Sequence, residues 1–268
     1  MSDAPPPRPP ERWLIIRLSG ALALPAGRSS LAYEPGRTQC ESVPNSELPF
    51  PVTSFTRGDS MNLLDQLDDN SVPLLLTDIP YNVVNRASGG LRNLDKGVAD
   101  IGEFDLDVLA RKMARVTSGS LYVFCGTEQV SQLRASFVDA GLTTRLCIWE
   151  KTNPSPMNSQ YLWMSSIETC VFARKRGAVF NDKYQSPVWR YPTVRSKRHP
   201  TEKPLKLFER LVEISSNPSD VVLDPFMGSG TTAEAALRQG RSFVGFDLED
   251  EFIRVSQQRV ADLMPASQ

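Results

Sequence analysis

The chain has 268 residues, of which 40% are hydrophobic and 23% charged, and 30 Lys and Arg nearly balance 31 Asp and Glu to give a net charge of −1. This length and composition predict one soluble α/β domain with extensions. They exclude a surface dominated by one sign of charge, and no apolar run is long enough to span a membrane. The four cysteines are scattered without a C-x-x-C pair and His199 is the single histidine, so we expect no metal site, no disulfide framework and a reducing, cytoplasmic location.

The amino-terminal segment, residues 1–51, is rich in proline, serine and glycine. Such a composition buries too little apolar surface to offset the entropy of ordering, so we expect a disordered or poorly ordered tail. Its apolar stretch at 13–24 is interrupted by Arg17, which argues against an export signal. The ordered domain, residues 52–268, is predicted to begin near Thr53.

Along this domain, short apolar runs suited to buried strands alternate with segments of helical spacing. The predicted strands are residues 54–57, 72–77, 120–125, 143–150, 166–173, 221–223 and 242–246. The predicted helices are residues 61–67, 104–116, 128–140, 204–216, 231–238 and 251–263. This alternation predicts an α/β fold with a parallel or mixed sheet.

Two segments, residues 82–100 and 155–198, carry the least regular sequence and are predicted to contain surface loops. The second overlaps a basic stretch, residues 174–206, which holds ten Lys and Arg against two Asp and Glu. Tyr184 and Trp189 are interleaved with these charges. A basic segment with aromatic residues on an otherwise acidic body predicts a local contact with a nucleic-acid backbone, and a solvated surface loop is the alternative.

The strand–turn–helix–strand unit at residues 221–249 predicts a ligand site. Gly228 and Gly230 follow the first strand and let the backbone approach a ligand without a Cβ in the way. The helix start after them offers free N–H groups and a positive dipole end to a carboxylate or phosphate. Asp247, at the end of the second strand, is placed to accept hydrogen bonds from two ribose hydroxyls. No Lys follows Gly230, which disfavours a P-loop, and NAD and S-adenosylmethionine both remain open as ligands at this point.

A second motif, Asp-Ile-Pro-Tyr after the predicted strand at 72–77, suits the methylation of an exocyclic amine on a nucleobase. Such an amine is a poor nucleophile because its lone pair is delocalised into the ring. Asp78 can accept one of its N–H groups and the backbone carbonyl of Ile79 the other, while Pro80 stiffens the turn. Tyr81 can stack on a base that has left the double helix. A methyl group carried on a sulfonium would then be displaced in line.

Together these motifs resemble those of the amino-group DNA methyltransferases of the β arrangement, in which the catalytic motif precedes the cofactor motif. The matching segments are TDIPY at 77–81, WEKTNP at 149–154, HPTEKP at 199–204, DPFMGSGTT at 224–232 and GFDLE at 245–249. The resemblance implies a Rossmann-like fold of S-adenosylmethionine-dependent methyltransferases, with a mixed, mostly parallel sheet and helices on both faces. It also implies that the domain at 52–268 is catalytic, with target-recognition loops near 82–100 and 155–198.

The resemblance implies a role for each matching residue. The residues of the catalytic segment would be Asp78, Ile79, Pro80 and Tyr81. The residues expected around the methionine part of S-adenosylmethionine are Asp224, Phe226, Gly228, Ser229, Gly230 and Thr231. Asp247 would take the ribose, and Asp59 would lie near the adenine ring of the cofactor. The residues expected to close over the cofactor carboxylate are His199, Thr201 and Lys203.

One position departs from the family, because Ile79 stands where a proline is usual. The backbone carbonyl survives this change, so we expect the chemistry to survive with a turn that is less fixed. Asp78 leans toward adenine N6, whereas serine at that position is commoner in cytosine-N4 enzymes. We therefore expect a site-specific adenine-N6 methyltransferase that flips its target base out of double-stranded DNA; a cytosine-N4 enzyme is the close alternative and a NAD-dependent oxidoreductase the distant one. A restriction-modification role and a homodimer are compatible with the sequence, although no residue indicates either.

Overall fold

The structure is a computed structural model of the chain, and the residues it describes are 52–81, 104–156, 160–194 and 202–263. The predicted tail at 1–51 and the predicted loop at 82–100 lie outside these described residues. Both therefore stay predictions, and the described residues all fall within the segment 52–268.

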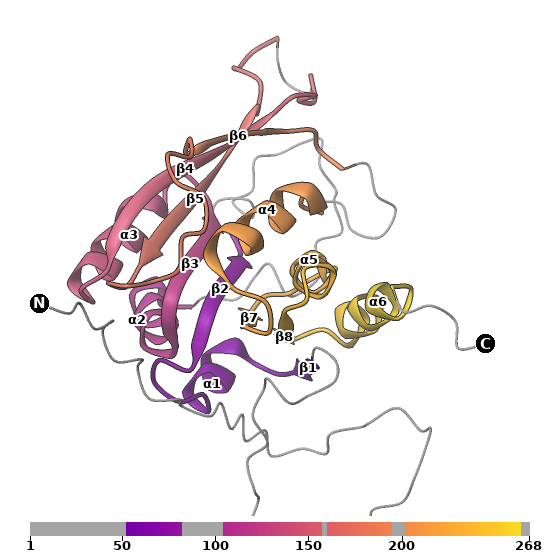
Figure 1. Ribbon diagram of the computed structural model, residues 1–268. Helices are drawn as coiled ribbons and strands as arrows, with labels where there is room; N and C mark the ends of the chain where they lie inside the picture. The colour runs from indigo at the N-terminus through magenta and orange to yellow at the C-terminus, as the bar shows by residue number, and fades with distance from the viewer. Residues whose placement is uncertain (1–51, 82–103, 157–159, 195–201, 264–268) are drawn as a thin grey trace, which may run out of the picture.

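Within the described residues, one sheet of eight strands has the order β1–β8–β7–β2–β3–β5–β4–β6 (Figure 1). Its strands are β1 Thr53–Arg57, β2 Val72–Asp78, β3 Thr117–Cys125, β4 Thr143–Lys151, β5 Ile167–Arg174, β6 Val188–Tyr191, β7 Val221–Asp224 and β8 Ser242–Asp247. Neighbouring strands run parallel except in the pairs β3–β5 and β5–β4, which are antiparallel. The prediction of a mixed, mostly parallel sheet is confirmed.

Helices cover both faces of this sheet, as predicted (Figure 1). They are α1 Ser60–Asp65, α2 Leu106–Val116, α3 Val130–Asp139, α4 Leu205–Ser215, α5 Thr231–Arg238 and α6 Asp250–Ala261. The side chains of β2 alternate between the two cores: Leu75 packs with α1–α3, whereas Leu74 and Leu76 pack with α4–α6. A strand buried on both faces supplies apolar side chains to each in turn, which is why its sequence is a continuous apolar run.

Two helices near the predicted site begin where their sequences favour it. α1 begins after Asp59, whose carboxylate accepts a hydrogen bond from the Met61 amide at 2.9 Å. α4 begins after Pro204, whose fixed φ suits a helix start. The prediction of a helix from residue 204 is therefore correct to within one residue.

One strand was not predicted, because the basic stretch forms β6 at the sheet edge beside β4. Trp189 is in register with Trp149, whose indole N–H donates to the Tyr191 carbonyl at 2.9 Å. Val188 and Arg190 are exposed while Trp189 and its neighbour Tyr191 are half-buried, so the strand does alternate. Four residues are too short a run for that alternation to stand out. The expectation of a loop is wrong for these residues.

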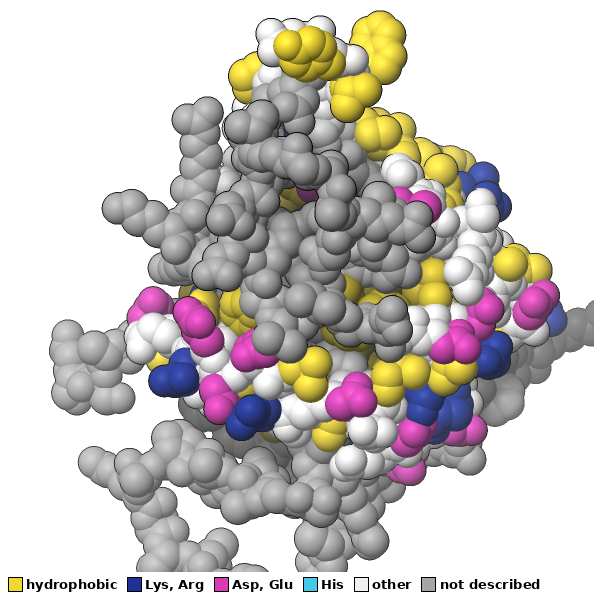
Figure 2. Space-filling model, turned by 180° about the vertical axis from the view of Figure 1, so that it is seen from behind, with side chains coloured by type: hydrophobic (Ala, Val, Ile, Leu, Met, Phe, Trp, Pro, Cys, Tyr) yellow, Lys and Arg dark blue, Asp and Glu magenta, His cyan; other side chains and the backbone are white. Residues whose placement is uncertain are grey.

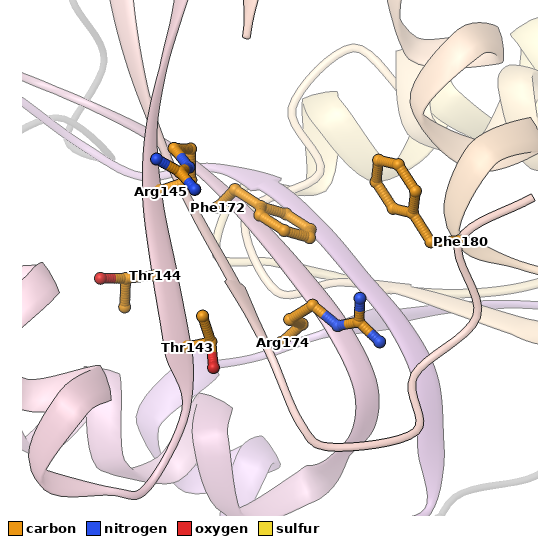
Figure 3. Close-up of a pocket in the computed structure, with 6 residues that line it drawn as sticks. All are labelled: Thr143, Thr144, Arg145, Phe172, Arg174 and Phe180. Atoms are coloured by element: carbon orange, nitrogen blue, oxygen red, sulfur yellow. The ribbon is translucent and has the colours of Figure 1, made fainter. Parts of the chain in front are cut away.

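A shallow cavity of about 250 Å³ lies on the outer part of the sheet (Figure 3). Its lining residues are Thr143, Thr144, Arg145, Phe172, Arg174 and Phe180. Arg174 pairs with Ser120 early in β3, whereas Thr169 pairs with Cys125 at the end of β3. The cavity is therefore at the opposite end of the sheet from the carboxyl ends of the parallel strands, where ligands of such folds bind.

Among the residues that the structure describes, no helix is both long and apolar enough to cross a membrane. The same residues contain no group of three or more His, Cys, Asp and Glu side chains arranged to hold a metal ion. Cys125, Cys147 and Cys170 are buried free thiols. Burial raises the pKa of the Cys125 thiol to about 12, which makes it unreactive as a thiolate.

Candidate active site

Two neighbouring strands bring the two predicted motifs to the same end of the sheet. β2 ends at Asp78 and β7 ends at Asp224, and the two strands pair in parallel. Across this pair, the Thr77 hydroxyl donates a hydrogen bond to the Asp224 carboxylate at 2.6 Å. The Asp-Ile-Pro-Tyr segment and the glycine-rich turn therefore leave the sheet side by side, at the carboxyl ends of the parallel strands, where ligands of such folds bind.

Asp224, at the end of β7, is buried and links β2, α5 and the turn that follows it. Its carboxylate accepts hydrogen bonds from the hydroxyls of Thr77 on β2 and Thr232 on α5, and from the Phe226 amide. Burial raises the pKa of Asp224 to about 7, against the effect of these donors. Because its oxygens are engaged within the fold, the direct role of Asp224 is to fix the turn, and its predicted contact with a cofactor stays a prediction.

The two glycines of the turn have different surroundings. Both have positive φ, 48° at Gly228 and 76° at Gly230, which non-glycine residues rarely adopt. A Cβ on Gly230 would lie 2.7 Å from the Ser256 hydroxyl oxygen of α6, whereas a Cβ on Gly228 would meet nothing within 4 Å. Gly230 is thus required for packing against α6, and Gly228 has open space beside it that a ligand could use.

Asp247 contacts the same turn from the end of the neighbouring strand. It ends β8, and its two carboxylate oxygens accept hydrogen bonds from the amides of Gly228, at 2.9 Å, and Glu249, at 3.0 Å. Burial raises the pKa of Asp247, and these amides oppose that shift. Each carboxylate oxygen has a second lone pair, so the side chain can still accept hydroxyl donors.

Arg259 of α6 holds the glycine-rich turn through hydrogen bonds. This buried side chain donates to the Ser229 carbonyl at 3.2 Å and to the Thr231 hydroxyl at 3.1 Å. It also pairs with Glu234 of α5 and, at 2.8 Å, with Glu202 just before α4. The polar groups of predicted cofactor residues Ser229 and Thr231 are therefore partly used to hold the fold.

Two other predicted cofactor residues flank the turn. Phe226 stacks obliquely on Phe104, with ring centroids 6.0 Å apart, and packs on the core beneath α1–α3. The carboxylate of Asp59 accepts hydrogen bonds from the Met61 amide and the Asn62 side chain. Its observed role is to cap α1, and its place near the adenine ring of a cofactor stays a prediction.

Around Asp78 lies a compact group of charged side chains. The buried Lys203 ammonium is 2.6 Å from Asp78 Oδ2 and 2.8 Å from Glu168 Oε2. Glu168 Oε1 is also 3.0 Å from the Lys151 ammonium. The Tyr81 hydroxyl donates to Asp78 Oδ1 at 2.9 Å, and Glu168 Oε2 is an alternative acceptor at 3.3 Å. Two carboxylates and two ammonium groups thus balance in one place.

These neighbours compete in setting protonation. Burial raises the pKa of Asp78 above its ordinary value, the Lys203 ammonium lowers it and the Glu168 carboxylate raises it. The pKa of Glu168 falls below its ordinary value because Lys203 and Lys151 together outweigh its burial. The pKa of Lys203 rises because the two carboxylates outweigh burial, so this lysine is an ammonium. The ionisation of Asp78 therefore depends on Lys203.

Hydrogen bonds fix the turn that contains Ile79. The Ile79 amide donates to the Phe124 carbonyl of β3 at 3.1 Å, a bond that the usual proline could not make. The side-chain amide of Gln129 donates to the Pro80 carbonyl at 3.1 Å. These two hydrogen bonds fix the turn that was expected to be less fixed without the proline.

A sequence profile of the N6/N4 family, described as DNA methylase, matches residues 72–258, which is more than half of the chain. The chain belongs to this DNA methylase family. Membership removes the oxidoreductase alternative that the glycine-rich turn had left open, since the matched region contains both motifs of the site.

Named relatives of the methylase agree with this assignment. The Type II methyltransferase M2.LlaDCHI of Lactococcus lactis subsp. cremoris is 28% identical over 240 residues, covering 77% of this chain and 88% of the relative. The Type II methyltransferase M2.MboI of Moraxella bovis is 28% identical over 243 residues, covering 78% and 88%.

Solved structures share the fold of the methylase. The M1.HpyAVI-SAM complex is 25% identical with a TM-score of 0.61, and the match covers 78% of this chain and 100% of that one. The PvuII DNA methyltransferase, titled cytosine-N4-specific, has a TM-score of 0.64 over 82% of this chain and 89% of its own, at 19% identity. The predicted Rossmann-like methyltransferase fold is confirmed.

The methylase site also contains residues that sequence reasoning missed. Lys151 and Glu202 lie inside the matching segments at 149–154 and 199–204, and this position is the signal that could have identified them. Glu168 and Gln129 carry no local signal, since only the pairing of β5 with β3 and β4 brings Glu168 to Asp78. The predicted residues His199 and Thr201 lie outside the described part of the chain. Lys203, predicted for the cofactor carboxylate, lies on Asp78 instead, and its cofactor role stays a prediction.

Proposed function

We propose that this methylase transfers a methyl group from S-adenosylmethionine to the exocyclic N6 of adenine in double-stranded DNA. The observation that carries the proposal is the pairing of β2 with β7, with the Thr77–Asp224 hydrogen bond at their ends. This pairing supports the proposal because the Asp-Ile-Pro-Tyr segment, which would bind the amine, then lies directly beside the glycine-rich turn, which would bind the cofactor. Both elements of a methyl transfer are then within one site.

The residues of the turn fit this cofactor. The open side of Gly228 admits close approach of the methionine part, and the amide end of α5 favours its carboxylate. Asp247 keeps lone pairs for the two ribose hydroxyls. When bound, S-adenosylmethionine supplies an electrophilic methyl group on its sulfonium.

The side chains around Asp78 would then prepare the target amine. The Asp78 carboxylate, fixed by Lys203 and Tyr81, accepts one N–H of the amine, and the Ile79 carbonyl accepts the other. Both contacts draw electron density back onto the nitrogen and improve it as a nucleophile. The Tyr81 ring, which is partly exposed, provides a face on which the flipped base can stack. Asp at the first position of the motif favours adenine over cytosine as the target.

A surface for DNA lies next to the site. The hairpin between β4 and β5 ends in an apolar tip, which we define as residues Tyr161, Leu162, Trp163 and Met164. Figure 2 shows apolar side chains gathered at this projecting end of the molecule. The strands below the tip carry Lys151 and Glu168, so the tip extends from the walls of the site. This placement supports a role in target recognition for part of the predicted segment at 155–198, together with its basic residues.

The proposal is tested with tritiated S-adenosylmethionine and duplex DNA, followed by nucleoside digestion and mass spectrometry. N6-methyladenine is the expected product. N4-methylcytosine in its place would establish the alternative target, and unlabelled DNA from protein that binds the cofactor would remove the proposal. Modified-base sequencing of the DNA of an expressing host identifies the methylated base and its sequence context. Size-exclusion chromatography distinguishes a monomer from a homodimer.

A further inference from the structure

The Lys203 ammonium is held by two carboxylates that come from different parts of the fold. It lies just before α4 and is buried, over the rings of Tyr81 and Phe124 at 5.5 and 5.7 Å. Asp78 ends β2, at the point where the chain leaves the sheet. Glu168 is the second residue of β5 and is paired with Trp149 of β4. The two carboxylates therefore reach Lys203 from two different strands of the sheet.

A buried ammonium is stable only when carboxylates or other acceptors surround it. Asp78 alone would have to fix Lys203 while it also receives the substrate amine. Glu168 removes this conflict, because it is 2.8 Å from the Lys203 ammonium and is itself fixed by Lys151 at 3.0 Å. Glu168 thus holds the Lys203 ammonium from β5, and the same ammonium contacts the Asp78 carboxylate.

We propose that Glu168 is a positioning residue for methyl transfer, which holds the Lys203 ammonium on the Asp78 carboxylate and so fixes that carboxylate for the target amine. The inference rests on the proposed role of Asp78 in the function given above. Glu168 acts through Lys203 and makes no contact with the reacting atoms.

The charge balance of the group makes a specific consequence testable. The titratable groups around Asp78 are Lys203 before α4, Glu168 and Cys170 of β5, Tyr81 after β2, Cys125 of β3 and Asp224 of β7, with Lys151 of β4 next to Glu168. Removing the Lys203 charge leaves two carboxylates with one ammonium, so the pKa of Asp78 rises further. Removing the Glu168 charge as well restores the balance and lowers that pKa again.

The experiment compares Glu168→Gln, Lys203→Met and the double variant with the wild type, at saturating S-adenosylmethionine and duplex DNA. The matched control is Glu150→Gln, since Glu150 lies on β4 beside Lys151 but pairs outward with Arg190 at 2.9 Å. For each protein, kcat is measured against pH and S-adenosylmethionine affinity by calorimetry. Thermal unfolding confirms that each variant is folded.

We expect Glu168→Gln to lower kcat by about 100-fold, the loss typical of a misplaced reacting group, with little change in S-adenosylmethionine affinity. Glu150→Gln should behave as the wild type. In Lys203→Met the acid limb of the kcat profile should move to higher pH, and in the double variant it should move back toward the wild-type position. Glu168→Asp, which keeps the charge, should retain more activity than Glu168→Gln.

A Glu168→Gln variant as active as Glu150→Gln would overturn the inference, and so would a double variant with the same acid limb as Lys203→Met. If Glu168→Gln does not fold, Glu168→Asp and the double variant decide by the same comparison. Asp78→Asn separates the two levels of the account. If it keeps its rate, the proposed function has the wrong carboxylate; if it is inactive while Glu168→Gln is normal, only the role of Glu168 fails.

Discussion

Gly228 and Gly230 differ in their surroundings although both have positive φ. At Gly230 the backbone conformation and the proximity of Ser256 on α6 both require the absence of a side chain. At Gly228 only the backbone conformation does, and the space beside it is open. One glycine therefore serves the packing of the turn, and the other is suited to the cofactor.

Alanine at each position should separate these roles. Gly230→Ala combines left-handed strain with a clash and should lower the free energy of unfolding by about 3 kcal/mol, against about 1 kcal/mol for Gly228→Ala. Gly228→Ala should instead lose the larger share of S-adenosylmethionine affinity. Urea denaturation and calorimetry measure the two quantities, and equal losses of stability would refute the distinction.

At the scale of elements, the site depends on how the segment before α4 is fastened. Glu202 pairs with Arg259 of α6, and the next residue, Lys203, pairs with Asp78 and Glu168. One buried arginine thus links α5, α6, the glycine-rich turn and the segment that carries Lys203. Arg259 supports both halves of the site without lying in either motif.

Loss of this arginine should therefore be costly. Arg259→Met leaves Glu202 and Glu234 in a buried place without their shared partner, and should lower the free energy of unfolding by about 3 kcal/mol. Arg254→Met, on the exposed side of the same helix, is the control and should have little effect. Chemical denaturation of both variants checks the difference; similar stabilities would mean that the buried pairs contribute little.

The hairpin tip is the second element with a testable role. Trp163 is 99% exposed, which is unusual for an apolar side chain of its size unless it meets a partner. If it contacts bases, Trp163→Ala should weaken DNA binding by roughly tenfold at fixed salt, because stacking on an aromatic side chain contributes on the order of 1–3 kcal/mol. S-adenosylmethionine affinity should not change.

Fluorescence anisotropy with labelled duplex DNA measures this effect. The control is Val138→Ala, which removes an exposed apolar side chain near the end of α3, close to the start of β4 and therefore away from the hairpin tip. Equal DNA affinities of Trp163→Ala and Val138→Ala would place the DNA elsewhere on the molecule.

At the scale of the whole molecule, local signals predicted the elements and long-range pairing determined the rest. The apolar run of β2 and the glycines before α5 are local features, so their strand and turn were predictable. The edge strand β6 is short and half-exposed, and only its pairing with β4 makes it a strand. Glu168 is one of 31 acidic residues in the sequence. It lies next to Lys203 only because β5 pairs antiparallel with β3.

The central claim is that the carboxylate of Asp78 prepares the target amine beside a separately held cofactor. Its most direct test measures methyl transfer and S-adenosylmethionine binding in parallel for the wild type and Asp78→Ala. We predict that transfer falls by at least about 100-fold, as for loss of a hydrogen-bonding group that stabilises the reacting atoms in the transition state, while S-adenosylmethionine affinity is preserved. A variant that retains most of its transfer rate would contradict the claim.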